Sequence, residues 1–71
     1  MSQWSSTKAR DVLAALLRIG WRVKRHVGTS HSVLARPDWP DFVFAFHENV
    51  EIGPKMLARI GKKTGLTPED L

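Results

Sequence analysis

Residues 21–47, WRVKRHVGTSHSVLARPDWPDFVFAFH, decide the fold of this chain. In residues 21–24 apolar and basic side chains alternate, which is the pattern of a half-buried strand. The small residues 28–30, Gly-Thr-Ser, form a plausible connection. A second strand is therefore expected over residues 31–36.

The rest of this stretch predicts a turn and a third strand. Residues 37–41, Pro-Asp-Trp-Pro-Asp, are a strong turn signal. In residues 42–47 three phenylalanines alternate with valine, alanine and histidine, which predicts a strand. Because the connections are short, the three strands are expected to form an antiparallel meander.

Helical periods flank the strands on both sides. Over residues 7–19 the apolar side chains recur at helical spacing, Ser5, Ser6 or Thr7 can supply the N-cap, and Gly20 can end the helix. Residues 48–53 are expected to be a loop. A second helix begins at Pro54, with Met56, Leu57, Ile60 and Thr64 on its apolar side, and runs to Gly65; residues 67–70 resemble the start of one more turn.

The predicted fold class is α+β, with the order α-β-β-β-α in a single domain over residues 1–71. Both helices are expected to cover one face of a three-stranded antiparallel sheet, which leaves the other face wet.

Composition narrows the function. Eleven Lys and Arg against seven Asp and Glu give a net charge of +4, which favours a polyanionic partner. The absence of cysteine excludes a disulfide scaffold, a thiol nucleophile and a Cys-ligated zinc site, and fits a cytoplasmic location. The longest apolar run is too short to span a bilayer, and residues 1–10 lack the apolar segment of a secretory signal. No glycine-rich phosphate loop precedes a helix, so no small-molecule cofactor is expected.

His31 is the candidate catalytic residue. It follows three small residues, so a substrate backbone can approach its imidazole closely. Imidazole exchanges a proton near neutral pH, which Lys and Arg side chains do not do readily. If the polyanionic partner is RNA, the substrate carries its own nucleophile, the 2′-hydroxyl. A general base then suffices for cleavage of the phosphodiester, without a metal. The alternative is that His31 only caps a strand or hydrogen-bonds a turn.

The other histidines are weaker candidates. His47 ends the third predicted strand and suits a general acid if it approaches His31, or it is a solvent-facing strand end. His26 is interpreted as an exposed polar residue. The spacings between the three histidines match no common ligand pattern, so no metal site is predicted.

Basic residues form two groups that are candidates for RNA binding, one on the first strand of the predicted sheet and one on the last helix. The last helix has no acidic residue between Lys55 and Lys63, and a face with charges of one sign suits phosphate binding. The alternative is that these charges form an ordinary solvated surface. Trp21 is expected in the core, and Trp39 is the better candidate for exposure. The candidate RNA-binding residues are Arg22, Lys24, Arg25, Lys55, Arg59, Lys62 and Lys63.

Several motifs resemble the HicA family of bacterial toxins. Gly20-Trp21 resembles the family's step from helix to strand, and Thr29-Ser30-His31 lies where the family has Gly-Ser-His. Arg36-Pro37-Asp38 resembles its hairpin turn, and the spacing from His47 through Glu51-Ile52 to Gly65-Leu66 is similar to its C-terminal half. The chain departs from the family at Thr29 and at Phe44-Ala45-Phe46, where Val-Pro-Arg is common.

The resemblance implies a double-stranded-RNA-binding-domain-like fold and cleavage of mRNA, with His31 as the catalytic residue and Ser30 and His47 as candidate support. It also implies a HicB-type antitoxin as protein partner. Two alternatives are a non-catalytic RNA-binding module of the same fold and, less favoured, a protein-interaction domain. Fold alone does not choose among them.

Overall fold

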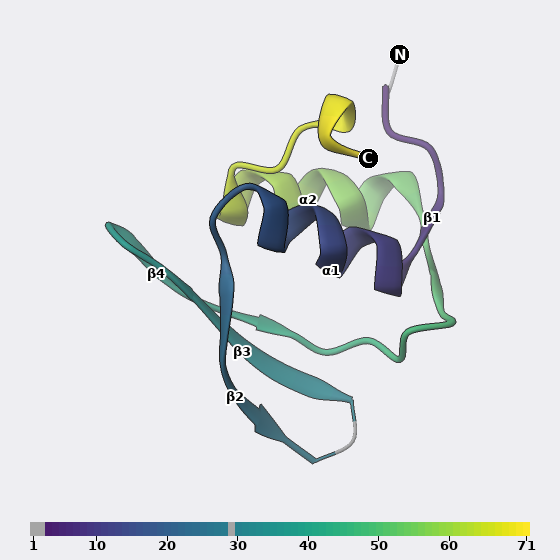
Figure 1. Ribbon diagram of the computed structural model, residues 1–71. Helices are drawn as coiled ribbons and strands as arrows, with labels where there is room; N and C mark the ends of the chain where they lie inside the picture. Colours follow the sequence, from purple (N-terminus) through teal and green to yellow (C-terminus); the bar gives the residue numbers. More distant parts are fainter. Residues whose placement is uncertain (1–2, 29) are drawn as a thin grey trace.

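The computed structural model describes residues 3–28 and 30–71, and Thr29, at the position of the family's glycine, lies outside the described residues. Both helices lie on one face of a three-stranded sheet, and no helix of the described chain covers the other face (Figure 1). The α+β class and the arrangement of both helices on one face are therefore confirmed. In chain order the main elements are α1 (Ala9–Arg18), β2 (Arg22–Val27), β3 (His31–Arg36), β4 (Trp39–Phe44) and α2 (Pro54–Thr64).

The sheet is an antiparallel meander with β3 in the centre. Its last strand, however, begins earlier than the predicted residue 42, because the β3–β4 turn consists of Pro37 and Asp38 alone. It also ends earlier, at Phe44, so the prediction that His47 ends this strand is wrong. Asp38 adopts a positive φ of 69°, a conformation that aspartate tolerates in tight turns. Pro40 then lies within β4, which is possible because β4 is an edge strand, where a missing N–H costs no interior ladder bond.

The predicted cap of α1 by Ser5, Ser6 or Thr7 is wrong, because the backbone N–H groups at the start of α1 bond to another part of the chain. Lys8 is at the N-cap position and makes no side-chain cap bond. Instead, the Ala9 N–H donates to the Val50 carbonyl at 2.8 Å, and the Arg10 N–H donates to the Glu48 carbonyl at 3.1 Å. These bonds fix the segment after β4 against the start of α1.

A second, two-stranded sheet replaces part of the predicted loop at residues 48–53. Strand β1 (Thr7–Lys8) pairs antiparallel with β5 (Glu51–Ile52), with Thr7 opposite Ile52. The pair continues the hydrogen bonding between residues 48–50 and α1. It therefore ties the N-terminal segment to the beginning of α2.

The second helix follows the prediction closely. Pro54 occupies its first turn, and Gly65 ends it in the left-handed conformation with φ of 79°. A short 3₁₀ turn, η1 (Pro68–Asp70), follows it. The prediction that Met56 lies on the apolar side of α2 is wrong, because its side chain remains 39% exposed. The buried side is formed by Leu57, Ile60 and Thr64.

The core lies between the helices and the sheet. Val12, Leu16, Leu34 and Leu57 are fully buried there, and Trp21 is only 2% exposed, as predicted. The Trp21 indole N–H donates to the Thr64 carbonyl at 2.9 Å, which joins the residue before β2 to the end of α2. This packing holds the sheet rigidly under the helices and leaves its opposite face available for a ligand.

Candidate functional site

Two consecutive residues at the start of β3, His31 and Ser32, face opposite sides of the sheet. Ser32 is buried on the side of the sheet that faces the helices, together with Leu34 two residues later. Side chains alternate along a strand, so His31 lies on the opposite face, where it is exposed. We call this helix-free side the open face.

The open face carries two basic residues of β2, Arg25 and Arg22, on the same side of the sheet as His31. Arg25 pairs with Val33, and Val27 pairs with His31, so Arg25 is the diagonal neighbour of His31 across the two strands. Arg22 pairs with Ala35 and lies on the same face. The structure therefore brings three of the residues selected from the sequence onto one surface.

Lys24 differs from the other two basic residues of β2. Its ammonium group forms an ion pair with Asp41 of β4 at 2.8 Å, and both side chains are about half exposed. A register irregularity between Val23 and Arg25 places Lys24 at a bulge. Because the carboxylate already neutralises it, Lys24 is a weaker phosphate ligand than Arg22 or Arg25.

A cavity of about 510 Å³ lies on the other side of the same hairpin, between β2–β3, the start of α1 and residues 44–49. Ser30 and His47 both line it, whereas His31 does not. The cavity thus brings together the two candidate supporting residues without the candidate base. His47 is held there by the turn in which its carbonyl accepts the Val50 N–H at 3.0 Å.

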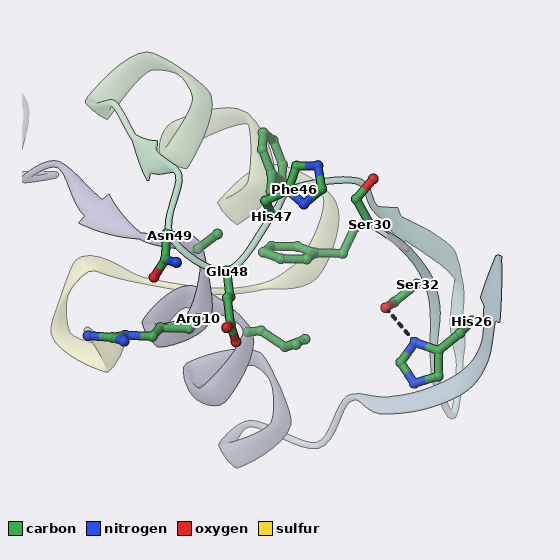
Figure 2. Close-up of a pocket in the computed structure, with 11 residues that line it drawn as sticks. Arg10, His26, Ser30, Ser32, Phe46, His47, Glu48 and Asn49 are labelled. Carbon is green, nitrogen blue, oxygen red and sulfur yellow. Dashed lines mark hydrogen bonds between the residues drawn. The ribbon is translucent and has the colours of Figure 1, made fainter. Parts of the chain in front are cut away.

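His26 is exposed, as predicted, and it also lines this cavity, a role for which it was not selected from the sequence. Its Nδ1 is 3.1 Å from the Ser32 hydroxyl oxygen, a hydrogen bond that fixes the ring (Figure 2). In the same view His26 and Arg10 lie at opposite ends of the cavity, with Glu48 between them and Phe46 and His47 to one side, near Ser30 (Figure 2). Cross-strand pairing of His26 with Ser32 is the signal that could have revealed this residue.

The predicted basic face of α2 is present but lies away from His31. All four of its Lys and Arg side chains are exposed. Two shallow adjoining grooves, of about 580 and 250 Å³, run between α2 and β4 and are lined in part by Arg59, Lys62 and Lys63. These three cations form no ion pair with any described residue.

Trp39 forms one wall of the larger groove. It is 37% exposed and contacts Trp21 edge-on, with ring centroids 6.0 Å apart. The Arg36 guanidinium lies 5.3 Å from its ring centroid, a cation–π contact. Trp39 is therefore partly exposed, as expected, but on a strand and not in a turn.

Within residues 3–28 and 30–71, no three His, Asp or Glu side chains gather as a metal site would require. No helix of this described part is long and apolar enough to cross a membrane.

The fold and this arrangement define a small basic α+β protein with an exposed histidine among cations on a helix-free sheet face. Residues 9–66 match the family model described as HicA toxin of bacterial toxin–antitoxin systems. Since the match spans more than half of the chain, the protein belongs to this family and is a toxin of a toxin–antitoxin system, with an antitoxin as partner. No individual curated protein matches the chain.

Proposed function

We propose that this toxin is an endoribonuclease that cleaves mRNA, with His31 as the general base. The observation that carries the proposal is the position of His31 in a HicA-family chain: it is exposed on the open face, with Arg25 as its diagonal neighbour. A proton acceptor beside a permanent cation is the combination that phosphodiester cleavage needs.

The proposed reaction uses the RNA's own hydroxyl group. The His31 imidazole removes the proton of a 2′-hydroxyl, the 2′-oxygen attacks the adjacent phosphorus, and the bond from phosphorus to the 5′-oxygen breaks. The leaving 5′-oxygen takes a proton, which water can supply at this exposed face. Arg25 stabilises the negative charge that develops on the phosphate, and Arg22, farther along β2 opposite Ala35, binds a more distant phosphate of the RNA. The products carry a 2′,3′-cyclic phosphate and a 5′-hydroxyl, and neither a metal nor a protein nucleophile takes part.

The test compares wild type with His31→Ala and His31→Gln on a single-stranded RNA in buffer containing EDTA. We expect both variants to lose cleavage and to keep the circular dichroism spectrum, because the exposed ring has little packing to lose. RNA binding should fall by less than about tenfold, since phosphate contacts supply most of the affinity. A substrate with 2′-deoxyribose at the cleaved position should resist the wild type.

Full activity of His31→Ala would overturn the assignment of the base. RNA that is bound but never cut by the wild type, with affinity unchanged in His31→Ala, would identify a non-catalytic RNA-binding module instead.

The antitoxin is proposed to be of the HicB type and to cover His31 together with the open face. One interface there blocks the base and also competes with RNA phosphates, and an acidic partner surface suits the net charge of +4. A standard interface buries about 800 Å² per partner, and this chain exposes 4848 Å² in total. Because the antitoxin binds the folded toxin, the complex should melt at a higher temperature than the toxin alone.

Site-resolved modification with diethyl pyrocarbonate tests this placement. In the complex His31 should be protected relative to the free toxin. If His31 stays fully reactive in the inhibited complex, direct occlusion is wrong.

A further inference from the structure

The cavity between α1 and the β2–β3 hairpin is not used by the reaction proposed above. Its volume of about 510 Å³ lies within the range of small-ligand sites, about 300–1,000 Å³. It opens on the helix-facing side of the hairpin whose other side carries His31. Ser30, the residue before His31 in the chain, lines it. A ligand that fills the cavity therefore lies across the same hairpin end as the proposed base.

The interior of the cavity is aromatic. Phe44 is 3% exposed, and Phe46, half-buried, packs against it with ring centroids 5.2 Å apart and an interplanar angle of 63°. Leu13 of α1 adds apolar surface. Such a surface suits the flat face of a nucleic-acid base, and stacking of this kind tolerates any base.

Polar groups surround this aromatic surface. His26 at one end is oriented by Ser32, and its Nε2 forms no hydrogen bond with a described residue. Arg10 lies at the other end, beyond Glu48, with its guanidinium group at the outer edge of the cavity (Figure 2). Glu48 also lines the cavity, and its carboxylate disfavours a bare phosphate inside it. The combination fits a nucleotide better than a simple anion.

We propose that this cavity binds one unstacked nucleotide of a single-stranded RNA, adjacent to the phosphate that is cleaved. The base lies on Phe46, with its edge toward the His26–Ser32 pair. The ribose–phosphate passes Ser30 and His47, and Arg10 neutralises a phosphate at the far end. His26 is then a specificity-determining residue, and the RNA bends around the hairpin end toward His31. The inference rests on the proposed ribonuclease function.

Binding is tested by NMR titration of the wild-type chain with each of the four nucleoside 5′-monophosphates and with inorganic phosphate. We expect saturable shifts at His26, Ser32, Phe46 and His47, and binding about tenfold or more tighter for the best nucleotide than for phosphate. His26→Ala and His26→Asn should each weaken the binding of that nucleotide by about tenfold. Arg10→Ala should weaken the binding of all four nucleotides alike. The matched control is Lys8→Ala, which removes an exposed cation that is near Arg10 in the chain but outside the cavity.

Kinetics separate this proposal from the assignment of the base. His26→Asn should raise KM about tenfold and change the preferred base beside the cut, with kcat within about twofold of wild type, whereas His31→Gln should abolish kcat. Two outcomes would overturn the nucleotide site and leave the ribonuclease assignment intact, provided that the wild type cleaves RNA. In one, nucleotides shift NMR signals only along the α2–β4 grooves. In the other, phosphate binds as tightly as the nucleotides. Nucleotide binding in the cavity with full activity of His31→Gln supports the site and rejects the base.

Discussion

Arg25 and His31 are diagonal neighbours on the open face of the sheet, because Arg25 pairs with Val33 and Val27 pairs with His31. Residues in this relation have Cα atoms about 7–8 Å apart, a distance that long side chains bridge. When a 2′-hydroxyl of the RNA lies at the His31 imidazole, an arginine side chain at this position can contact the adjacent phosphate. The register of β2 and β3 thus gives the proposed base a companion cation.

Arg25→Ala is the first prediction. Removing the guanidinium should lower kcat/KM for RNA cleavage on the order of tenfold or more, because charge on the phosphate is then stabilised less in the transition state. Arg25→Lys should recover part of the loss. Lys8→Ala, which removes an exposed charge remote from the open face, is the control. An Arg25→Ala enzyme as active as this control would show that the cation has no part in the reaction.

The ion pair between Lys24 and Asp41 gives the second prediction. Asp41→Asn should free Lys24 to bind phosphate and raise RNA affinity a few-fold. The slope of log affinity against log salt concentration should become steeper, by an amount that corresponds to the release of up to about one more counterion. The stability of the fold should change by no more than about 1 kcal/mol, since both side chains are about half exposed. Asp38→Asn removes the same charge from the neighbouring turn. An equal gain in both variants would mean that net charge alone is responsible.

Reversal of charge on α2 is the third prediction. Lys62→Glu with Lys63→Glu should weaken RNA binding across sequences and flatten the slope of affinity against salt concentration. Both side chains are exposed, so the free energy of unfolding should change by at most about 0.5 kcal/mol for each. Binding at several salt concentrations measures the slope. An unchanged slope would confine the RNA to the open face and the β2 cations.

Elements with a clear period are predictable from the sequence, and those without one are not. The apolar stripes of α1 and α2 and the alternation in β2 indicate these elements directly. Strands β1 and β5 have two residues each, too few for a period, and their pairing joins Thr7 to Ile52 across most of the chain. The N-terminus of α1 is satisfied by the carbonyls of Glu48 and Val50, which are also distant in the chain, so a local cap signal could not predict it.

The candidate site shows the same limit. His31 is identifiable because of the small residues before it and the family motif. The face on which it lies depends on the β2–β3 register, since a shift of one residue would exchange it with Ser32. His26 reads as an isolated polar residue in sequence, and only its pairing with Ser32 turns it into an oriented group. Arg10 reaches the cavity through packing that no local pattern encodes.

Gly61→Ala is the fourth prediction and concerns stability. Alanine normally stabilises a helix interior by about 1 kcal/mol relative to glycine. Here a Cβ atom would lie 2.7 Å from the Leu66 carbonyl oxygen and 2.9 Å from the Trp4 ring, so the chain must shift. We expect a net loss of about 1–3 kcal/mol in urea unfolding. Gly53→Ala, whose Cβ meets nothing within 4 Å, should lose less; a stabilised Gly61→Ala would contradict the close packing.

The last prediction concerns pH and the C-terminal turn. Hydrogen bonds from the Thr67 backbone N–H and hydroxyl to the Asp70 carboxylate, at 2.8 and 2.9 Å, lower the pKa of Asp70 below its ordinary value. A lowered pKa means that this stabilisation is fully present above the ordinary value and is lost as pH falls through the folded one. The turn should then loosen, weakening the bond from Arg18 to the Asp70 carbonyl, 2.7 Å in the structure. Carboxyl NMR titration should show the lowered pKa, and Asp70→Asn should remove this acid dependence. An Asp70 carboxyl that titrates at or above its ordinary value would refute the prediction.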